Sequence, residues 1–311
     1  MRSAQPGSIV RERTFMRRSR LIALLVALLP VLVVVIFVGF PALMALTFSL
    51  GYTAGPNAPV AQLAQNLVTA EHGLTLAVYQ TLLHDRAFLQ DFWATIWVTL
   101  ASVALILVTG WGLALYIRFS SGWFTHVVSS IYLVPLFIPV VIASYAIVTF
   151  WNANGYVSAL AAKIGMHFPG FGYTLFGVVI GQIWVNLPFA VLLLASGLQS
   201  VPDALIEAAR DVGATTPRIL VRVIVPLNML PTIIVATFTG IGVLGSFTIP
   251  FLVGPTAPAL LGVAMTNYYQ SYNQPQQAVA MAVIVFVLAA GIGALYVWAN
   301  VVSDRKAGKL Q

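Results

Sequence analysis

One stretch of this sequence combines residue types and spacings that could do chemistry, namely Val201 to Pro226, VPDALIEAARDVGATTPRILVRVIVP. The stretch predicts two short helices joined by a turn. Pro202 suits the first position of a helix, where no amide hydrogen is needed. Gly213 can adopt the left-handed conformation that ends a helix, and Thr216-Pro217 can begin the second helix as N-cap and first residue.

The first of these helices is predicted to present a small apolar stripe next to one carboxylate. The stripe recurs at helical spacing and consists of Leu205, Ala208, Ala209 and Val212. Its alanines would let a partner approach closely. Such a helix could instead lie on a lipid surface, but surface helices carry larger apolar anchors and more lysine. The pattern therefore favours docking onto a protein.

The sequence lacks the residues of common catalytic and cofactor sites. It has no cysteine, and its histidines are isolated from one another: His72, His84, His126 and His167. None of the three lysines lies in the G-x-x-x-x-G-K-[ST] pattern of a phosphate-binding loop. Gly240-Ile-Gly242-Val-Leu-Gly245 matches a dinucleotide pattern but lies in an apolar run, so we interpret it as close helix packing or a flexible stretch. We predict no catalytic residue, no metal site and no cofactor of its own.

Composition indicates which elements must position the Val201–Pro226 segment. Of 311 residues only 7% are charged and 60% are hydrophobic, whereas soluble domains are about 25% charged. Six apolar runs exceed the roughly 20 residues that a helix needs to cross a bilayer, and lipid leaves helices as the structure that satisfies their backbone. The runs are Leu21–Leu50, Phe92–Ile117, Val127–Trp151, Tyr173–Val201, Leu227–Val253 and Gln277–Ser303. We therefore predict an all-α integral membrane protein.

The basic residues predict the orientation of these runs. Thirteen of fifteen lie in the segments that would share one side of the membrane, and only Arg86 and Lys163 lie on the other. Because lysine and arginine concentrate on the cytoplasmic side, both termini are predicted to be cytoplasmic. The expected organisation is a basic N-terminus (1–20), a first span (21–50) too long for a cleaved signal peptide, an external loop (51–91) with a short helix such as 58–70, a five-span core (92–303) that includes the cytoplasmic loop 201–226, and a tail (304–311). Segments 152–172 and 254–276 are also predicted to be external.

The cytoplasmic loop resembles the EAA motif, E-A-A-x3-G-x9-I-x-L-P, of permease subunits of bacterial ATP-binding-cassette importers. Glu207, Ala208, Ala209, Gly213 and Pro226 match this pattern, while valines 223 and 225 replace the usual isoleucine and leucine. The runs WVNLPF (184–189) and GSFTIP (245–250) also look like this family, and the second is most similar to its spermidine/putrescine branch. The resemblance covers residues 91–303.

The resemblance implies a six-helix, type I (MetI-like) permease fold in the bacterial inner membrane. It implies as partners two ATPase subunits that hold ATP and magnesium, a second permease subunit that is homologous but not identical, an external solute-binding protein and membrane lipid, with no nucleic acid. Residues 202–212 would be the coupling helix that docks on an ATPase. The implied ATPase-coupling residues are Leu205, Glu207, Ala208, Ala209, Arg210, Val212, Gly213 and Pro226.

Polar residues within the apolar runs are candidates for a solute pathway. The candidates are Tyr145, Asn186, Thr237, Ser246, Phe247 and Thr248. Hydrogen bonding between helices is the alternative for each of them. Branch similarity predicts a polyamine or similar organic cation, although no span supplies a carboxylate to offset its desolvation and only external Glu71, Asp85 and Asp91 could attract it. The alternatives are an importer for a phosphonate, sugar, amino acid or metal complex, and a stand-alone passive channel.

Overall fold

The computed structural model describes residues 26–70 and 73–307, with side chains up to residue 301, and this part of the chain contains helices but no strand. The all-α prediction is thereby confirmed for these residues. The elements are η1 (Val35–Gly39), α2 (Phe40–Ser49), η2 (Gly55–Asn57), α3 (Ala58–Ala61), α4 (Ala77–His84), α5 (Arg86–Phe119), α6 (Trp123–Ile131), η3 (Val134–Phe137), α7 (Val140–Trp151), α8 (Tyr156–Lys163), α9 (Leu175–Gln199), α10 (Asp203–Asp211), α11 (Thr216–Ile219), η4 (Leu220–Ile224), α12 (Val225–Leu227), α13 (Met229–Leu244), α14 (Thr248–Val253), α15 (Leu261–Thr266), η5 (Asn267–Ser271) and α16 (Pro275–Ala307).

Several helices are long and apolar enough to cross a membrane. Five such helices occur among the described residues, or six if a pair bent by 68° counts as one span. They are Val26–Ser49, Arg86–Phe119, Val140–Lys163, Leu175–Gln199, Pro275–Val301 and the bent pair Thr216–Leu227 with Met229–Leu244. The chain is therefore a multi-pass membrane protein. The predicted basic N-terminus, the start of the first span, Glu71, His72 and residues 308–311 lie outside the described residues.

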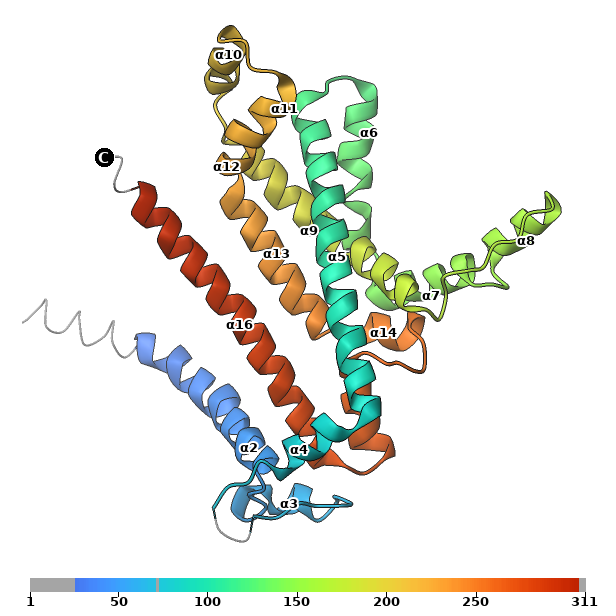
Figure 1. Ribbon diagram of the computed structural model, residues 1–311, viewed down its shortest axis with the longest axis vertical. Helices are drawn as coiled ribbons and strands as arrows, with labels where there is room; N and C mark the ends of the chain where they lie inside the picture. The colour runs from blue at the N-terminus through green and yellow to red at the C-terminus, as the bar shows by residue number, and fades with distance from the viewer. Residues whose placement is uncertain (1–25, 71–72, 308–311) are drawn as a thin grey trace, which may run out of the picture.

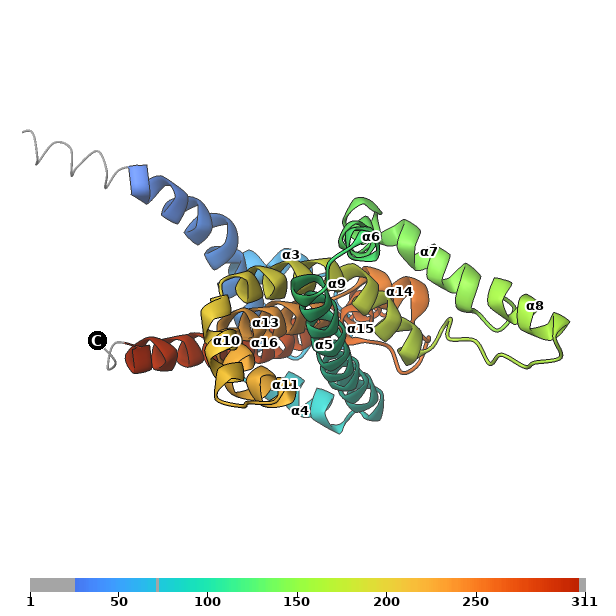
Figure 2. The ribbon, with the colours of Figure 1, turned by 90° about the horizontal axis from the view of Figure 1, so that it is seen from above.

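The bundle is built around α5 and α9, which pack along each other, while α13 packs against both and against α16 (Figure 1). Gly110 of α5 permits this approach, since a methyl group there would lie 3.3 Å from the side chains of Ala190 and Leu194. Residues 201–226, which we call the coupling loop after the role that the resemblance implies, lie with α10 at one end of the bundle, and α3 and α4 lie at the other. Seen from above, α7 and α8 project sideways from the bundle (Figure 2).

The third predicted span is wrong as a single helix. The stretch is divided into α6, the 3-10 turn η3 and α7. Pro135 and Pro139 lack the amide hydrogen that a continuous helix requires. Ile138, which precedes a proline, takes an extended conformation with ψ of 119°. The two prolines therefore account for the division.

The fifth predicted span, Leu227–Val253, is also wrong as a single helix. It is bent at Asn228 and interrupted again after Gly245, so that α13 and the short α14 are separate. The close packing proposed for the glycine pattern is wrong at Gly242, where an added methyl group would meet nothing within 4 Å. Gly240 is buried at ordinary contact distance, and Gly245 ends α13.

The external loop is less helical than predicted. The expected helix 58–70 ends at Ala61, and the longer helix of this region is α4. From Gln65 on, backbone amides bond to distant groups: Gln65 donates to the carbonyl of Asn273 at 2.7 Å, and Val68 donates to Oε1 of the buried Gln276 at 2.9 Å. These long-range partners replace the i−4 carbonyls of a helix. The helix that contains the predicted run Phe92–Ile117 is longer than that run, because α5 begins at Arg86.

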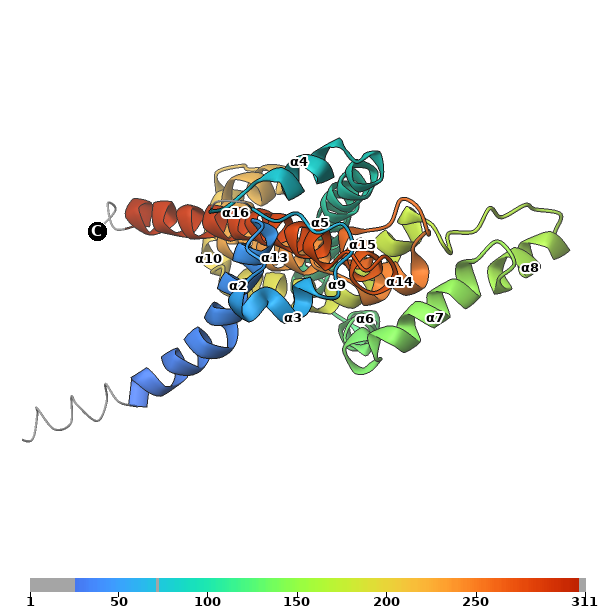
Figure 3. The same cartoon turned by 90° about the horizontal axis from the view of Figure 1, so that it is seen from below.

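The first helix, Val26–Ser49, leaves the bundle at an angle (Figure 3). Its side chains become buried only at Phe48 and Ser49. There the Ser49 hydroxyl lies 2.7 Å from the hydroxyl of Tyr79 in α4. The helix is thus attached to the rest of the chain through α2, which packs on α16 and is most deeply buried at its last turn.

Candidate functional site

The loop 201–226, which was predicted to be cytoplasmic, forms the predicted helix, turn and second helix. Pro202 is the N-cap of α10 and not, as was predicted, its first residue. The N-cap of α11 is Thr215 and not the predicted Thr216. Gly213 has φ of +81°, so the predicted left-handed turn is found there. Its amide donates to the carbonyl of Arg210 at 2.8 Å, and the amide of Ala214 donates to that of Ala209 at 3.0 Å. This pair of bonds is a Schellman motif, which fixes where α10 ends.

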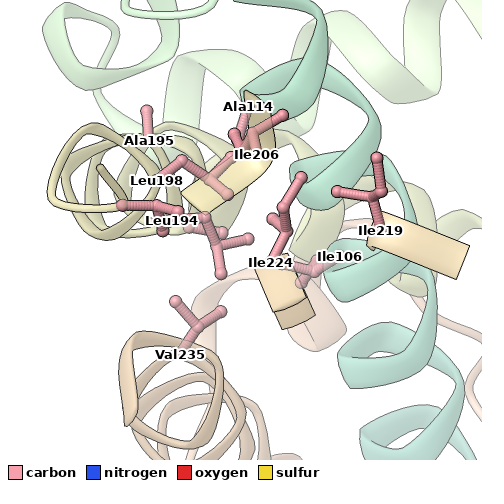
Figure 4. Packing of buried hydrophobic residues seen from close by; sticks show 11 residues of the cluster. Ile106, Ala114, Leu194, Ala195, Leu198, Ile206, Ile219, Ile224 and Val235 are labelled. Atoms are coloured by element: carbon pink, nitrogen blue, oxygen red, sulfur yellow. The ribbon is translucent and has the colours of Figure 1, made fainter. Parts of the chain in front are cut away.

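The helix α10 is held to the bundle by Ile206. This side chain is 6% exposed and packs in a cluster with residues such as Leu198, Ile219 and Ile224 (Figure 4). Ala209 packs on the edge of the same cluster. Ile206 was not among the residues predicted from the sequence, although it is the only isoleucine in the helix and precedes Ala209 by three residues.

Three residues of the predicted apolar stripe lie on the opposite, solvent-facing side of α10, whereas the fourth, Ala209, faces the core. Leu205 is 47% and Val212 is 84% exposed, and Ala208 is also exposed. Glu207 and Arg210 are exposed as well, and Glu207 forms no ion pair within the part of the chain whose side chains are described. The surface therefore offers two large apolar side chains, a small one between them and an unpaired carboxylate.

A second attachment of α10 comes from Arg118 at the end of α5. Its guanidinium forms an ion pair with Asp203, the first residue of α10, and its Nε donates to the carbonyl of Leu198 at 3.3 Å. Among described side chains this is the only ion pair. From the sequence, Arg118 counted only among the basic residues that predict membrane orientation, because nothing local marks a contact across 85 positions.

The second helix of the loop leads into a sharp bend. Pro226 cannot donate to the carbonyl of Arg222, and the turn before it widens into the π-helical η4. Asn228 at the bend is fully buried and donates to the carbonyl of Leu194 at 3.2 Å. A methyl group on Gly197 would overlap the Asn228 side chain. The motif proline and Asn228 thus join the coupling loop to the core.

Two of the predicted pathway residues, Asn186 and Ser246, both contact Gln182, which is not one of those candidates. The buried Gln182 amide donates to the Ser246 hydroxyl at 2.7 Å. Asn186 donates to the carbonyl of Gln182 at 2.8 Å and lies 3.3 Å from its Oε1. This network, which we call the amide–hydroxyl network (Gln182, Asn186 and Ser246), lies where the chain breaks between α13 and α14.

The other predicted pathway residues take different positions. Phe247 follows Ser246 directly and stacks on Phe251 with ring centroids 5.1 Å apart, and Thr248 begins α14 half-buried. Thr237 is buried in α13, about 13 Å along the helix axis from Ser246. Tyr145 is 60% exposed on α7. Only Phe247 and Thr248 therefore adjoin the network.

Two of the three carboxylates that were predicted to be external and to attract a cation, Asp85 and Asp91, are engaged within the fold. Asp85 caps α5 through the amide of Ala87 at 2.9 Å and accepts the Tyr268 hydroxyl at 2.8 Å. Burial, followed by the bond to Asp85, raises the pKa of Tyr268, so this phenol remains a donor. Asp91 accepts the amide of Ala259 at 2.8 Å. Within the described residues no group of His, Asp and Glu could hold a metal ion.

Comparison with known proteins gives a family match over residues 106–308, to a family described as binding-protein-dependent transport system inner membrane component. The chain is 33% identical over 204 residues to the trehalose transport system permease protein SugA of Mycobacterium tuberculosis, covering 63% of this chain and 64% of SugA, less than two thirds of that protein. It is 27% identical over 230 residues to the sulfoquinovosyl glycerol transport system permease protein SmoG of Agrobacterium fabrum, covering 70% and 73%. It is 34% identical over 134 residues to the spermidine/putrescine transport system permease protein PotB of Haemophilus influenzae, covering 43% and 46%.

Solved structures share the fold. A chain of a bacterial ABC transporter involved in the import of the acidic polysaccharide alginate superposes with a TM-score of 0.73 at 20% identity, over 94% of this chain and 99% of that one. A chain of the MetNI methionine ABC transporter in an inward-facing conformation gives 0.51 at 20% identity, over 68% and 93%. The second superposition leaves about a third of this chain unmatched.

Proposed function

The chain belongs to the family of binding-protein-dependent transport system inner membrane components, the permease subunits of bacterial ATP-binding-cassette importers, and on that premise we propose that it forms half of a solute pathway and couples it to ATP hydrolysis through α10. Two ATPase subunits would bind ATP and magnesium. A second permease subunit, homologous and not identical, would complete the pathway, and an external protein would deliver the solute. The complex would lie in the bacterial inner membrane.

The exposed face of α10 is the observation that supports this function. Ile206 and Arg118 attach the helix from within, which leaves Leu205, Glu207, Ala208 and Val212 free for a partner. A small residue between two larger apolar ones allows a groove wall to approach closely, and desolvated apolar contacts at the centre of an interface carry most of the binding energy. A stand-alone channel would have no use for such a face.

Copurification with the ATPase tests this proposal. Ala208→Trp adds a bulky group on the exposed face without touching the core, and should reduce the ATPase retained by the purified permease. Ser121→Trp, which is exposed in the loop after α5, is the matched control and should retain it. If both variants retained the same amount of ATPase, α10 would not be the docking site.

The proposed orientation places both termini and α10 in the cytoplasm, with 51–91, 152–172 and 254–276 outside. In its support, α10 and the C-terminal end of α16 lie toward the same end of the molecule (Figure 1). The native chain has no cysteine, so single cysteines report cleanly. Ala87→Cys should react with an impermeant maleimide from outside and Ser121→Cys only after permeabilisation, and the opposite pattern would invert the topology.

We propose a neutral, hydroxyl-rich solute of the sugar kind in place of the polyamine expected from branch similarity. The amide–hydroxyl network carries no charge, and Asp85 and Asp91 are already engaged by Tyr268 and Ala259. Amide and hydroxyl groups suit hydroxyls, whereas a cation without a carboxylate would pay for its desolvation. Calorimetric titration of the cognate binding protein with trehalose and with spermidine tests this proposal. Heat of binding with spermidine alone would contradict the sugar proposal and favour a polyamine as the solute.

A further inference from the structure

We propose that Arg118 is a positioning residue that sets the direction of α10, so that movement of this helix is transmitted to the bundle. The inference rests on the proposed function, since it names the residue through which the coupling helix and the core are linked. The arrangement joins the ends of three helices, α5, α9 and α10, around one guanidinium.

Local capping leaves the direction of α10 open. The N-cap is Pro202, which makes no side-chain capping bond. Asp203, the first residue, is the kind of side chain that stabilises a helix start through the dipole, but its carboxylate points to Arg118. The direction of α10 therefore depends on contacts with the rest of the chain.

The two tertiary attachments of α10 differ in what they restrict. Ile206 is an apolar contact in the core cluster, and apolar burial is non-directional, so it fixes where the helix sits but permits rotation about the contact. The Arg118–Asp203 pair restricts that rotation, because a planar guanidinium donates along defined directions. The guanidinium is also anchored to α9, because Nε of Arg118 donates to the carbonyl of Leu198 in the last turn of that helix, a carbonyl that accepts the amide of Val201 as well.

The solvent exposure of the Arg118–Asp203 pair distinguishes a positioning role from a contribution to overall stability. The Arg118 side chain is 21% exposed and that of Asp203 is 67% exposed. Ion pairs so open to solvent contribute little to the free energy of unfolding. Loss of the pair should therefore leave the protein folded, with α10 still attached through Ile206 but no longer held in one direction.

The test uses the complete transporter, reconstituted with its ATPase and binding protein, and measures ATP hydrolysis and solute uptake together. Arg118→Gln and Asp203→Asn should each lower the uptake per ATP hydrolysed by about fivefold, the factor that an exposed ion pair can supply, with hydrolysis and thermal unfolding unchanged. Arg118→Lys keeps the charge but loses the planar guanidinium that reaches Leu198 and Asp203 together. Its uptake per ATP hydrolysed should therefore lie between those of the wild type and Arg118→Gln. Exchange of the charges in Arg118→Asp with Asp203→Arg should restore part of the lost uptake.

A second measurement does not depend on the ATPase. Spin labels on Thr109→Cys in α5 and Ala208→Cys in α10, in the otherwise cysteine-free chain, should give a narrow distance distribution that broadens in Arg118→Gln. Unchanged uptake per ATP and an unchanged distribution in the single variants would overturn the positioning role, and so would a charge-exchanged variant no better than the worse single one. Absence of ATP-driven uptake in the wild type would overturn the proposed function, while the spin-label result would still decide the positioning role.

Discussion

The coupling loop and the break between α13 and α14 are both interruptions of a helical chain, and they are built with different chemistry. In the coupling loop a left-handed glycine ends α10, while an ion pair at the water boundary orients its start. At the break, neutral amide and hydroxyl groups bond to each other inside the bundle. Charge is used where water can solvate it, and dipoles are used where it cannot. The two interruptions therefore differ in charge: the loop carries an exposed ion pair, whereas the break is polar without charge.

The largest expected effect concerns the junction beneath the coupling loop. Gly197→Ala would overlap Asn228 and Pro231, and we expect it to lower the free energy of unfolding by about 3 kcal/mol, the upper range for overpacking a core. Gly242→Ala near the break is the matched control, since its methyl group meets nothing within 4 Å, and alanine favours a helix by up to about 1 kcal/mol over glycine. Thermal unfolding in detergent measures both, and equal stabilities would erase the contrast between a tight junction and an open break.

The next effect concerns the amide–hydroxyl network. Gln182→Leu removes the donor to Ser246 and the acceptor near Asn186, and should lower the free energy of unfolding by about 2 kcal/mol, the cost of leaving buried polar groups unpaired. Adding Ser246→Ala removes one of the unpaired groups, so the double variant should lose less than the sum of the single variants. A strictly additive result would mean that the two side chains do not interact.

A smaller effect on stability is expected at the turn of the coupling loop. Gly213→Val forces a β-branched residue into φ of +81°, at about 1–2 kcal/mol, although an added side chain meets no neighbour within 4 Å. We expect the variant to insert into the membrane, transport poorly and retain less ATPase, because the second helix is misdirected. Gly213→Asn should be milder, since asparagine tolerates this conformation.

The smallest effect on stability is expected for Glu207→Gln. The side chain is exposed, so the free energy of unfolding should change by less than about 0.5 kcal/mol, while ATPase retention and uptake fall by less than in Gly213→Val. The fall reflects an ion pair with the partner, which contributes under about 1 kcal/mol if it stays exposed. Normal uptake and full ATPase retention in both Glu207→Ala and Gly213→Val would make Glu207 a solvated surface residue.

The sequence predicted the coupling loop well because its determinants are local. A helix N-terminus, a glycine turn and a second start are each marked within a few residues, and their positions were correct to within one residue. Apolar runs likewise predicted the long helices. The breaks at Pro135, Pro139 and Gly245 were missed as breaks because mean hydropathy stays high across them, although the prolines were visible.

The contacts that define the two regions could not be read from local patterns. Gln182 and Ser246 are 64 positions apart, and Arg118 and Asp203 are 85 apart. Ile206 resembled any other apolar residue of a short helix until the cluster around it was known. Side chains that meet only after the helices have packed have no periodic signature in the sequence.

The first helix has a consequence for how this chain can change over time. Because the side chains of residues 26–38 are all exposed, whereas α2 packs on α16, the first half of Val26–Ser49 has no shape to match within the described chain. Substitution in that half is constrained by hydropathy and length and not by fit, so it can drift or be exchanged for another apolar segment that continues into α2.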